Sequence, residues 1–201
     1  MKQQHELHHS DLKGFVERAL TLKGVFRTSY LVAIMITGVT FIFFGGFSIT
    51  QVFMRSEWPS FVRQLLVMIS VVPVLIVLHE LIHSFGFLFL GIRKFYFGGS
   101  IKKFYFYVAT DESLSGLQYI FVALMPFLVF TTVFLFILFT HNQWVFCISG
   151  LLFFHTTFCA GDFGVSNYVV LNGIKSASIQ SSRKEGVTRF SFIKKEKPSQ
   201  L

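Results

Sequence analysis

Two histidines and a glutamate interrupt a long apolar run, in the sequence His79-Glu80-Leu81-Ile82-His83. On a helix, residues four apart leave the same face, so the imidazoles of His79 and His83 can reach one metal ion. Imidazole nitrogens bind zinc at about 2.0–2.1 Å, and a glutamate beside them can accept the proton of an attacking water. The pattern predicts a Zn2+ centre with His79 and His83 as ligands and Glu80 as general base.

The same five-residue pattern, HExxH, occurs a second time, at His5-Glu6-Leu7-His8-His9, in a polar stretch without an apolar flank. Terminal segments are usually poorly ordered, so we interpret this copy as a chance match. The inner copy differs because each ionisable group at bilayer depth costs about 2.5–3.5 kcal/mol on insertion scales. The alternative interpretation of the inner copy is a pair of structural histidines that hydrogen-bond to neighbouring helices.

The composition is that of an integral membrane protein and not of a soluble domain. Of 201 residues, 53% are hydrophobic, 28 are Phe and only 14% are charged,. The formal net charge of +8 is concentrated outside the apolar segments, which indicates membrane lipids with anionic head groups as partners,. No segment resembles a nucleic-acid-binding module, so nucleic acid is not an expected partner.

The elements that must position these side chains are four predicted transmembrane helices, so the expected fold is mostly α. The predicted spans are residues 29–52, 61–90, 114–140 and 144–171,. An aromatic stretch around Gly98-Gly99 predicts a short β-hairpin over 92–109, between the second and third spans,. The hairpin could offer a strand edge to an extended substrate, or anchor at the lipid head groups.

The predicted organisation has three parts: a polar, amphipathic segment (1–28), the membrane core (29–172) and a basic, flexible tail (173–201),. Basic residues gather in both outer parts and in the loop after the second span. The positive-inside rule then places the N- and C-termini in the cytoplasm of a multi-pass cell-membrane protein. In this orientation spans two and four run in the same direction.

Asp162 is the candidate third metal ligand. It stands about 18 residues into the fourth span and His79 about 17 into the second, so both reach nearly the same depth at about 1.5 Å per residue. Two imidazoles and a carboxylate leave a fourth zinc position open for water. The alternative role for Asp162 is a structural carboxylate that hydrogen-bonds His155 or another helix.

His155 is an auxiliary candidate in the same span as Asp162. Seven residues separate the two, which places them nearly on one helix face,. His155 could be the third ligand in place of Asp162, or steady the substrate or the oxyanion. The two cysteines, Cys147 and Cys159, are expected to be free thiols, and we interpret Cys159 as a packing residue,.

Taken together, the inner HExxH in a span, the hairpin after it and Ala160-Gly161-Asp162 in a later span resemble the bacterial membrane zincins. They are also similar to the core of site-2 proteases, intramembrane zinc enzymes whose third ligand is an Asp in a later transmembrane helix. The resemblance covers residues 29–172 and is sharpest at the HExxH motif. This chain has Asp162-Phe163 where site-2 proteases have Asp-Gly, and it lacks their Asn-x-x-Pro lead-in.

The predicted function is zinc-dependent hydrolysis of a peptide bond, with a peptide or membrane-protein segment presented near the cytoplasmic face as substrate. Glu80 would take a proton from water and later donate it to the leaving amine. Two other classes stay open. One is a metal-binding membrane protein without peptidase activity, and the other is a transport protein whose polar residues line an ion or proton path.

Overall fold

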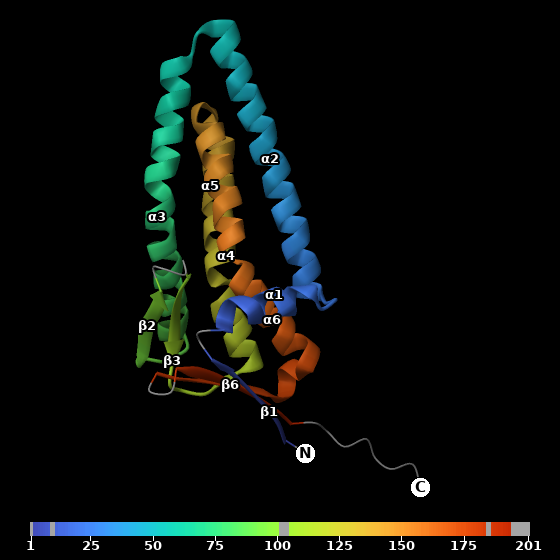
Figure 1. Ribbon diagram of the computed structural model, residues 1–201. Helices are drawn as coiled ribbons and strands as arrows, with labels where there is room; N and C mark the ends of the chain where they lie inside the picture. The colour runs from blue at the N-terminus through green and yellow to red at the C-terminus, as the bar shows by residue number, and fades with distance from the viewer. Residues whose placement is uncertain (1, 9–10, 101–104, 184–185, 194–201) are drawn as a thin grey trace. The chain divides into compact units, whose positions relative to one another are not determined.

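The computed structural model describes residues 2–8, 11–100, 105–183 and 186–193 (Figure 1). The chain divides into two compact units. The predicted hairpin residues 101–104, residues 9–10, and residues 194–201 of the predicted tail lie outside this range. One unit, the helical unit, contains Thr28–Ile82 and Met125–Ala160. The sheet unit contains Met1–Arg27, His83–Leu124 and Gly161–Leu201. All four dividing points, after residues 27, 82, 124 and 160, lie inside helices and not at loops.

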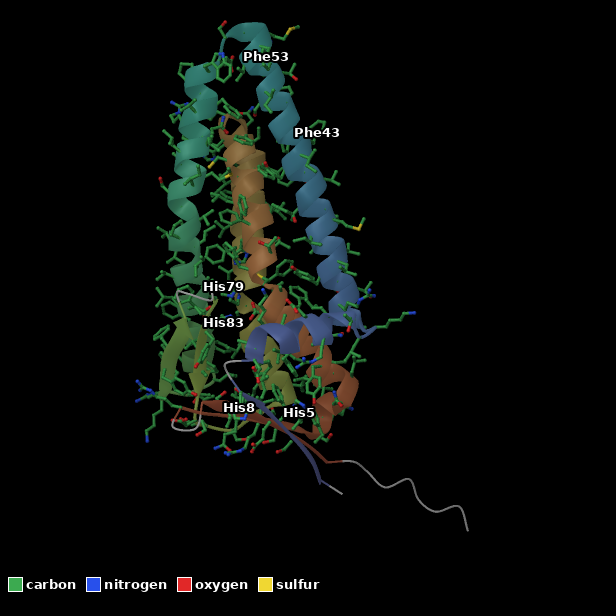
Figure 2. The ribbon with its side chains drawn as sticks, viewed as in Figure 1. His5, His8, Phe43, Phe53, His79 and His83 are labelled. Carbon is green, nitrogen blue, oxygen red and sulfur yellow. The ribbon has the colours of Figure 1, made fainter. Side chains whose placement is uncertain are left out.

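Three helices are individually long and apolar enough to cross a membrane: α2 (Val25–Arg55), α3 (Trp58–Phe89) and α4 (Gly116–Thr140). At about 1.5 Å per residue, each exceeds the hydrocarbon thickness of about 30 Å. Large apolar side chains stay exposed along α2, including Phe43 and Phe53, which Figure 2 labels. A helix that meets lipid has this kind of apolar exterior, so these helices are compatible with a membrane protein.

The predicted fourth span, 144–171, is two helices and not one. These are α5 (Val145–Phe158) and α6 (Ala160–Gly173), and Cys159 separates them. Taken together, Asn142–Phe158 and Ala160–Ser176 are long and apolar enough for a span, but they are bent by 42° at the break. The described residues therefore contain three candidate spans, or four if the broken pair forms one.

Aromatic rings fill the core of the helical unit. Phe41 and Phe61 stack on Phe146, with ring centroids 5.7 and 5.1 Å away. Met68 contributes from α3, and a Cβ added at Gly150 would clash with its sulfur. The absence of a side chain at Gly150 therefore lets α5 approach α3 closely, as small residues do in membrane helix packing.

The sheet unit is built on four antiparallel strands in the order β1-β6-β5-β4 (Figure 1). β1 (Lys2–His8) pairs with β6 (Val187–Ile193), β6 with β5 (Ala177–Ser182), and β5 with the short β4 (Leu114–Ser115). A separate antiparallel pair, β2 (Phe95–Ser100) and β3 (Tyr105–Thr110), lies in the stretch predicted as a hairpin. Its register runs from Phe95 opposite Thr110 to Ser100 opposite Tyr105.

One face of the four-stranded sheet packs on α1 (Leu12–Thr21) and on α6. Phe15 of α1 stacks on Phe190 of β6 at a centroid distance of 5.8 Å, and Phe190 is almost fully buried. The buried amide of Asn167 on α6 donates to the carbonyls of Ala19 and Leu22, near the end of α1. This amide satisfies carbonyls that the end of a helix leaves without intrahelical partners.

The described parts of both terminal segments form strands, where the sequence predicted flexible or poorly ordered chain. Residues 177–182 and 187–193 belong to the predicted flexible tail, and they form paired strands instead. Ala177, Ile179, Phe190 and Phe192 are buried and supply the apolar burial that a disordered segment lacks,. The N-terminal residues 2–8 pair with the same sheet, so residues 5–8 of the motif copy belong to a strand.

Candidate metal centre

The inner HExxH motif lies on α3, as its spacing predicted, and Figure 2 labels both histidines there. His79 and His83 are one turn apart on the same helix, and residues at this spacing have Cβ atoms about 5–6 Å apart. Their relative exposures are 5% and 7%. Two buried imidazoles on one face of an apolar helix therefore lie as a bidentate metal-binding element requires.

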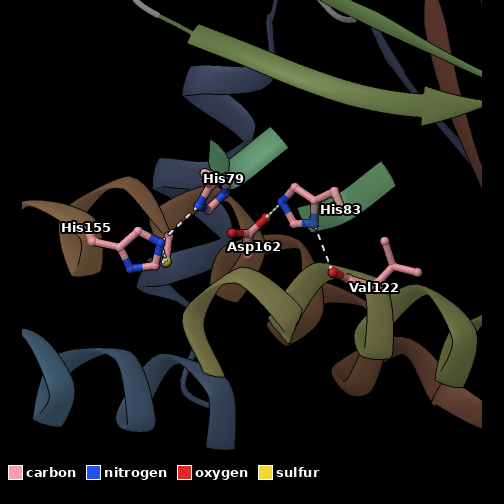
Figure 3. Close-up of polar contacts among 6 residues, drawn as sticks. His79, His83, Val122, His155 and Asp162 are labelled. Atoms are coloured by element: carbon pink, nitrogen blue, oxygen red, sulfur yellow. Dashed lines mark hydrogen bonds and ion pairs between the residues drawn. The ribbon is translucent and has the colours of Figure 1, made fainter. Parts of the chain in front are cut away.

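His83 contacts two groups within the sheet unit (Figure 3). Its Nδ1 is 2.9 Å from the backbone carbonyl of Val122 on α4, and its Nε2 is 3.3 Å from Oδ1 of Asp162 on α6. A carbonyl oxygen can only accept, so Nδ1–H donates to Val122. This hydrogen bond places the lone pair of a neutral His83 on Nε2, which faces the carboxylate. A carbonyl behind a histidine is the usual outer-shell support of a metal ligand.

The separation between His83 and Asp162 suits two ligands of one ion. A lone pair and a carboxylate oxygen repel each other unless a proton or a cation lies between them. Two ligands at about 2.0–2.2 Å from a tetrahedral zinc lie about 3.3–3.4 Å apart. The observed 3.3 Å is longer than the 2.7–2.9 Å that is usual for a charge-assisted hydrogen bond,. The donor chemistry and the spacing therefore fit a shared zinc ion.

The break at Cys159 determines the electrostatic surroundings of Asp162. Because α6 begins at Ala160, Asp162 falls in its first turn. Free backbone amides and the helix dipole make the start of a helix favourable for a negative charge. A continuous span through residue 159 would have placed this carboxylate in the middle of a helix, without that stabilisation. The break thus keeps Asp162 suited to bind as an anion.

His79 has a different neighbour, within the helical unit. Its Nδ1 lies 3.3 Å from Nε2 of His155 on α5 (Figure 3). The ring of His155 is fully buried and lies 4.5 Å from the ring centroid of Phe130. His155 therefore contacts the α3 histidine at its Nδ1. This arrangement gives His155 a supporting position behind a predicted ligand.

Glu80 follows His79 on α3, about 100° further around the helix. Its side chain is partly buried, and its Oε2 has no exposed surface. The structure thus provides a partly buried carboxylate next to the first predicted ligand. Its part in proton transfer remains a prediction.

Sequence reasoning missed two contributors to these clusters. The first is the carbonyl of Val122, which no side-chain pattern could indicate because the contact comes from the backbone. The second is Cys159, interpreted above as packing, whose sulfur lies 3.8 Å from Nδ1 and 3.9 Å from Nε2 of His155. The spacing of four residues between His155 and Cys159 was the available signal, because it repeats the spacing of His79 and His83. Neither Cys147 nor Cys159 forms a disulfide, as expected.

The N-terminal copy of the motif lies on β1, where Figure 2 labels His5 and His8. Alternate residues of a strand face opposite sides, so the helical reasoning for positions i and i+4 does not apply. The ring of His5 lies near Phe15 and Tyr168, and Glu6 accepts a hydrogen bond from Arg189 at 2.7 Å. These contacts give both residues structural roles in the sheet unit.

Comparison with known proteins gives one result for this region of the chain. A family described as "Putative zincin peptidase" matches residues 72–172, half of the chain. The matched range begins shortly before His79 and ends beyond Asp162, so it contains each residue of both histidine clusters. No curated protein and no solved structure matches the chain.

Proposed function

Because the chain belongs to the family described as "Putative zincin peptidase", we propose that it is a membrane-embedded zinc metallopeptidase. Its substrate would be a peptide or a membrane-protein segment, cleaved near the cytoplasmic face. The long apolar helices α2, α3 and α4 support the membrane setting. The buried histidines of α3 and the carboxylate beside one of them support the metal chemistry.

The proposed zinc ligands are His79, His83 and Asp162. The observation that carries this proposal is the 3.3 Å pair of His83 Nε2 and Asp162 Oδ1, with His83 oriented from behind by the Val122 carbonyl. His79 adds the third ligand because it precedes His83 by one turn of the same helix. Two histidines and one carboxylate form a donor set that catalytic zinc sites use, with a position left open.

A zinc ion held by these residues would supply Lewis-acid activation of water and of the scissile carbonyl. Glu80 would accept the proton of the attacking water and then deliver it to the departing amine. Asp162 would balance the positive charge, and the start of α6 would keep it anionic. The Val122 carbonyl and His155 would hold the two imidazoles in their ligating orientations.

The proposed location is the cell membrane, with both termini in the cytoplasm. The basic residues of the terminal segments and of the stretch after α3 support this orientation by the positive-inside rule,. Anionic lipid head groups would then be the surface partners of these residues. The metal site would lie toward the cytoplasmic end of the spans, where a substrate could approach from that side.

The test is zinc analysis of the purified full-length protein in detergent. We expect stoichiometric zinc in Cys159→Ser and loss of zinc in Asp162→Asn/Cys159→Ser, because the amide keeps the size of the Asp162 side chain but removes its charge. Both proteins carry Cys159→Ser so that the thiol beside His155 cannot hold zinc elsewhere. Asp11→Asn/Cys159→Ser is the matched control, since Asp11 is exposed and makes no side-chain capping bond. Equal zinc in Asp162→Asn/Cys159→Ser and Cys159→Ser would contradict the proposed ligand set. A wild type without zinc would favour the ion-path class instead.

A further inference from the structure

A second group of potential metal ligands lies entirely within the helical unit. It consists of His79, His155 and Cys159, whose candidate ligand atoms all lie within 4.8 Å of one another. His155 and Cys159 are fully buried, and His79 is nearly so. His155 and Cys159 repeat, at the end of α5, the four-residue spacing by which His79 and His83 share a face of α3. The proposed peptidase mechanism makes no use of the thiol.

The separations in this group resemble those of a metal site. Two nitrogens bound to one tetrahedral zinc lie about 3.3 Å apart, and a nitrogen and a sulfur lie about 3.6 Å apart. The corresponding distances here are 3.3 Å for His79 Nδ1 and His155 Nε2, and 3.9 Å for His155 Nε2 and Cys159 Sγ. Small side-chain movements would bring all three atoms to bonding distance of one ion.

We propose that His79 Nδ1, His155 Nε2 and Cys159 Sγ form a second site, which binds a thiophilic divalent cation. Thiolate and imidazole donors favour zinc and softer ions over magnesium or calcium. Binding would release the thiol proton to solvent, because only the thiolate is a ligand. The rings of Phe130 and Phe134 lie against His155 and keep the surroundings apolar, which strengthens the attraction between the cation and the thiolate,.

The two sites would compete for one imidazole. In a neutral histidine only one ring nitrogen has a free lone pair, so an ion bound to Nδ1 of His79 leaves the proton on Nε2. The same ring then cannot use Nε2 to bind the zinc of the proposed active site. This competition rests on the proposed function, whereas the existence of the second site does not. A thiophilic ion would thus withdraw a ligand from the catalytic ion.

The experiment uses Co2+ as a spectroscopic probe, in full-length protein that has been stripped of metal in detergent. The Asp162→Asn background weakens the proposed catalytic site and leaves all three ligands of the second site in place. We expect a thiolate-to-cobalt charge-transfer band in this variant at one equivalent of Co2+. The band should disappear in Asp162→Asn/Cys159→Ser and persist in Asp162→Asn/Cys147→Ser. Cys147, which lies on α5, is the matched control because it is also a buried cysteine.

In the wild type we expect a weaker thiolate-to-cobalt band than in Asp162→Asn at one equivalent of Co2+. This band should grow as more Co2+ is added. Far-ultraviolet circular dichroism verifies that each variant keeps its helical content. A folded Asp162→Asn protein without the band would overturn the second site, and so would a band that depends on Cys147. Neither result would affect the proposed peptidase, whose own test is the effect of Asp162→Asn on zinc content in the Cys159→Ser background. Absence of zinc from Cys159→Ser, together with a cobalt–thiolate band in Asp162→Asn, would overturn the peptidase alone.

Discussion

The two copies of the HExxH pattern adopt different secondary structures. The inner copy lies on α3, where His79 and His83 share a buried face, whereas residues 5–8 of the N-terminal copy belong to β1. In the helix the first histidine meets another imidazole, and in the strand it meets aromatic rings. The glutamates differ as well, because Glu6 pairs with Arg189 across the sheet while Glu80 is partly buried in an apolar helix.

The HExxH pattern therefore predicts a metal site only when its residues lie on a helix and in apolar surroundings. A helix brings positions i and i+4 together, and a strand separates positions i and i+1 onto opposite faces. An apolar helix also makes idle ionisable groups costly, whereas an exposed strand edge tolerates them at little cost. Each residue of the N-terminal copy can therefore serve as a matched control for its counterpart on α3.

The largest expected difference between the copies concerns the glutamates. Glu80→Gln should reduce peptide hydrolysis by about 10²–10⁴-fold, because the amide cannot accept the proton of water. Zinc content should stay at the wild-type level, since Glu80 is not a proposed ligand. The measurement is the appearance of new N-termini in membrane-protein test substrates, by mass spectrometry, with protein in liposomes. As the control, Glu6→Gln should cleave the substrates at the wild-type rate. Equal activity of Glu80→Gln and wild type would contradict the proposed role of Glu80 as general base.

The next difference concerns the first histidines. His79→Ala removes a proposed ligand, so zinc affinity should fall by more than the roughly 10–100-fold that loss of an outer-shell partner costs. His5→Ala should leave zinc affinity unchanged, because the ring of His5 contacts Phe15 and Tyr168 in the sheet unit. Competition with a chelator of known affinity measures both values. If His5→Ala lowered the zinc affinity and His79→Ala did not, the N-terminal copy and not the α3 copy would bind the metal.

The sequence allowed the apolar helices and the inner motif to be predicted, since both depend on local patterns. Residues 29–52, 61–90 and 114–140 fall almost wholly within α2, α3 and α4, because long apolar runs allow few other structures,. The spacing of His79 and His83 likewise predicted a shared helix face. Composition could not reveal the break at Cys159, because the residues around it are as apolar as those of a continuous span.

The terminal strands escaped prediction for a different reason. The alternation of Phe190, Ser191 and Phe192 was visible in the sequence, but its Lys-, Arg- and Ser-rich surroundings favoured a flexible tail. Only the pairing of β6 with both β1 and β5 provides the partners that bury these rings. The contacts of His83 with Val122 and of His79 with His155 are likewise long-range. No local pattern could have specified them.

The smallest expected effect concerns acid, at the N-terminal copy. Arg189 donates a hydrogen bond to Glu6 and attracts its charge, so the pKa of this carboxyl lies below its usual value of 4.5. The two residues are directly opposite in the β1–β6 register. A carboxyl whose pKa is lowered by folding stabilises the folded state at pH values above its unfolded pKa. That contribution disappears as the pH falls through the folded pKa. The effect should be modest because the pair is exposed to solvent,.

Hydrogen exchange of residues 2–8, corrected for the intrinsic pH dependence of the exchange rate, measures this contribution. Protection of β1 in the wild type should fall as the pH is lowered below 4.5, the usual value for the carboxyl. Glu6→Gln should already show reduced protection at neutral pH, with no further loss over the same acid range, because its amide does not titrate. Glu80→Gln should match wild type in this strand, since Glu80 lies on α3. If wild-type protection stays constant through the acid range, the ion pair does not help to hold β1 on β6, and the N-terminal glutamate lacks the structural role assigned to it.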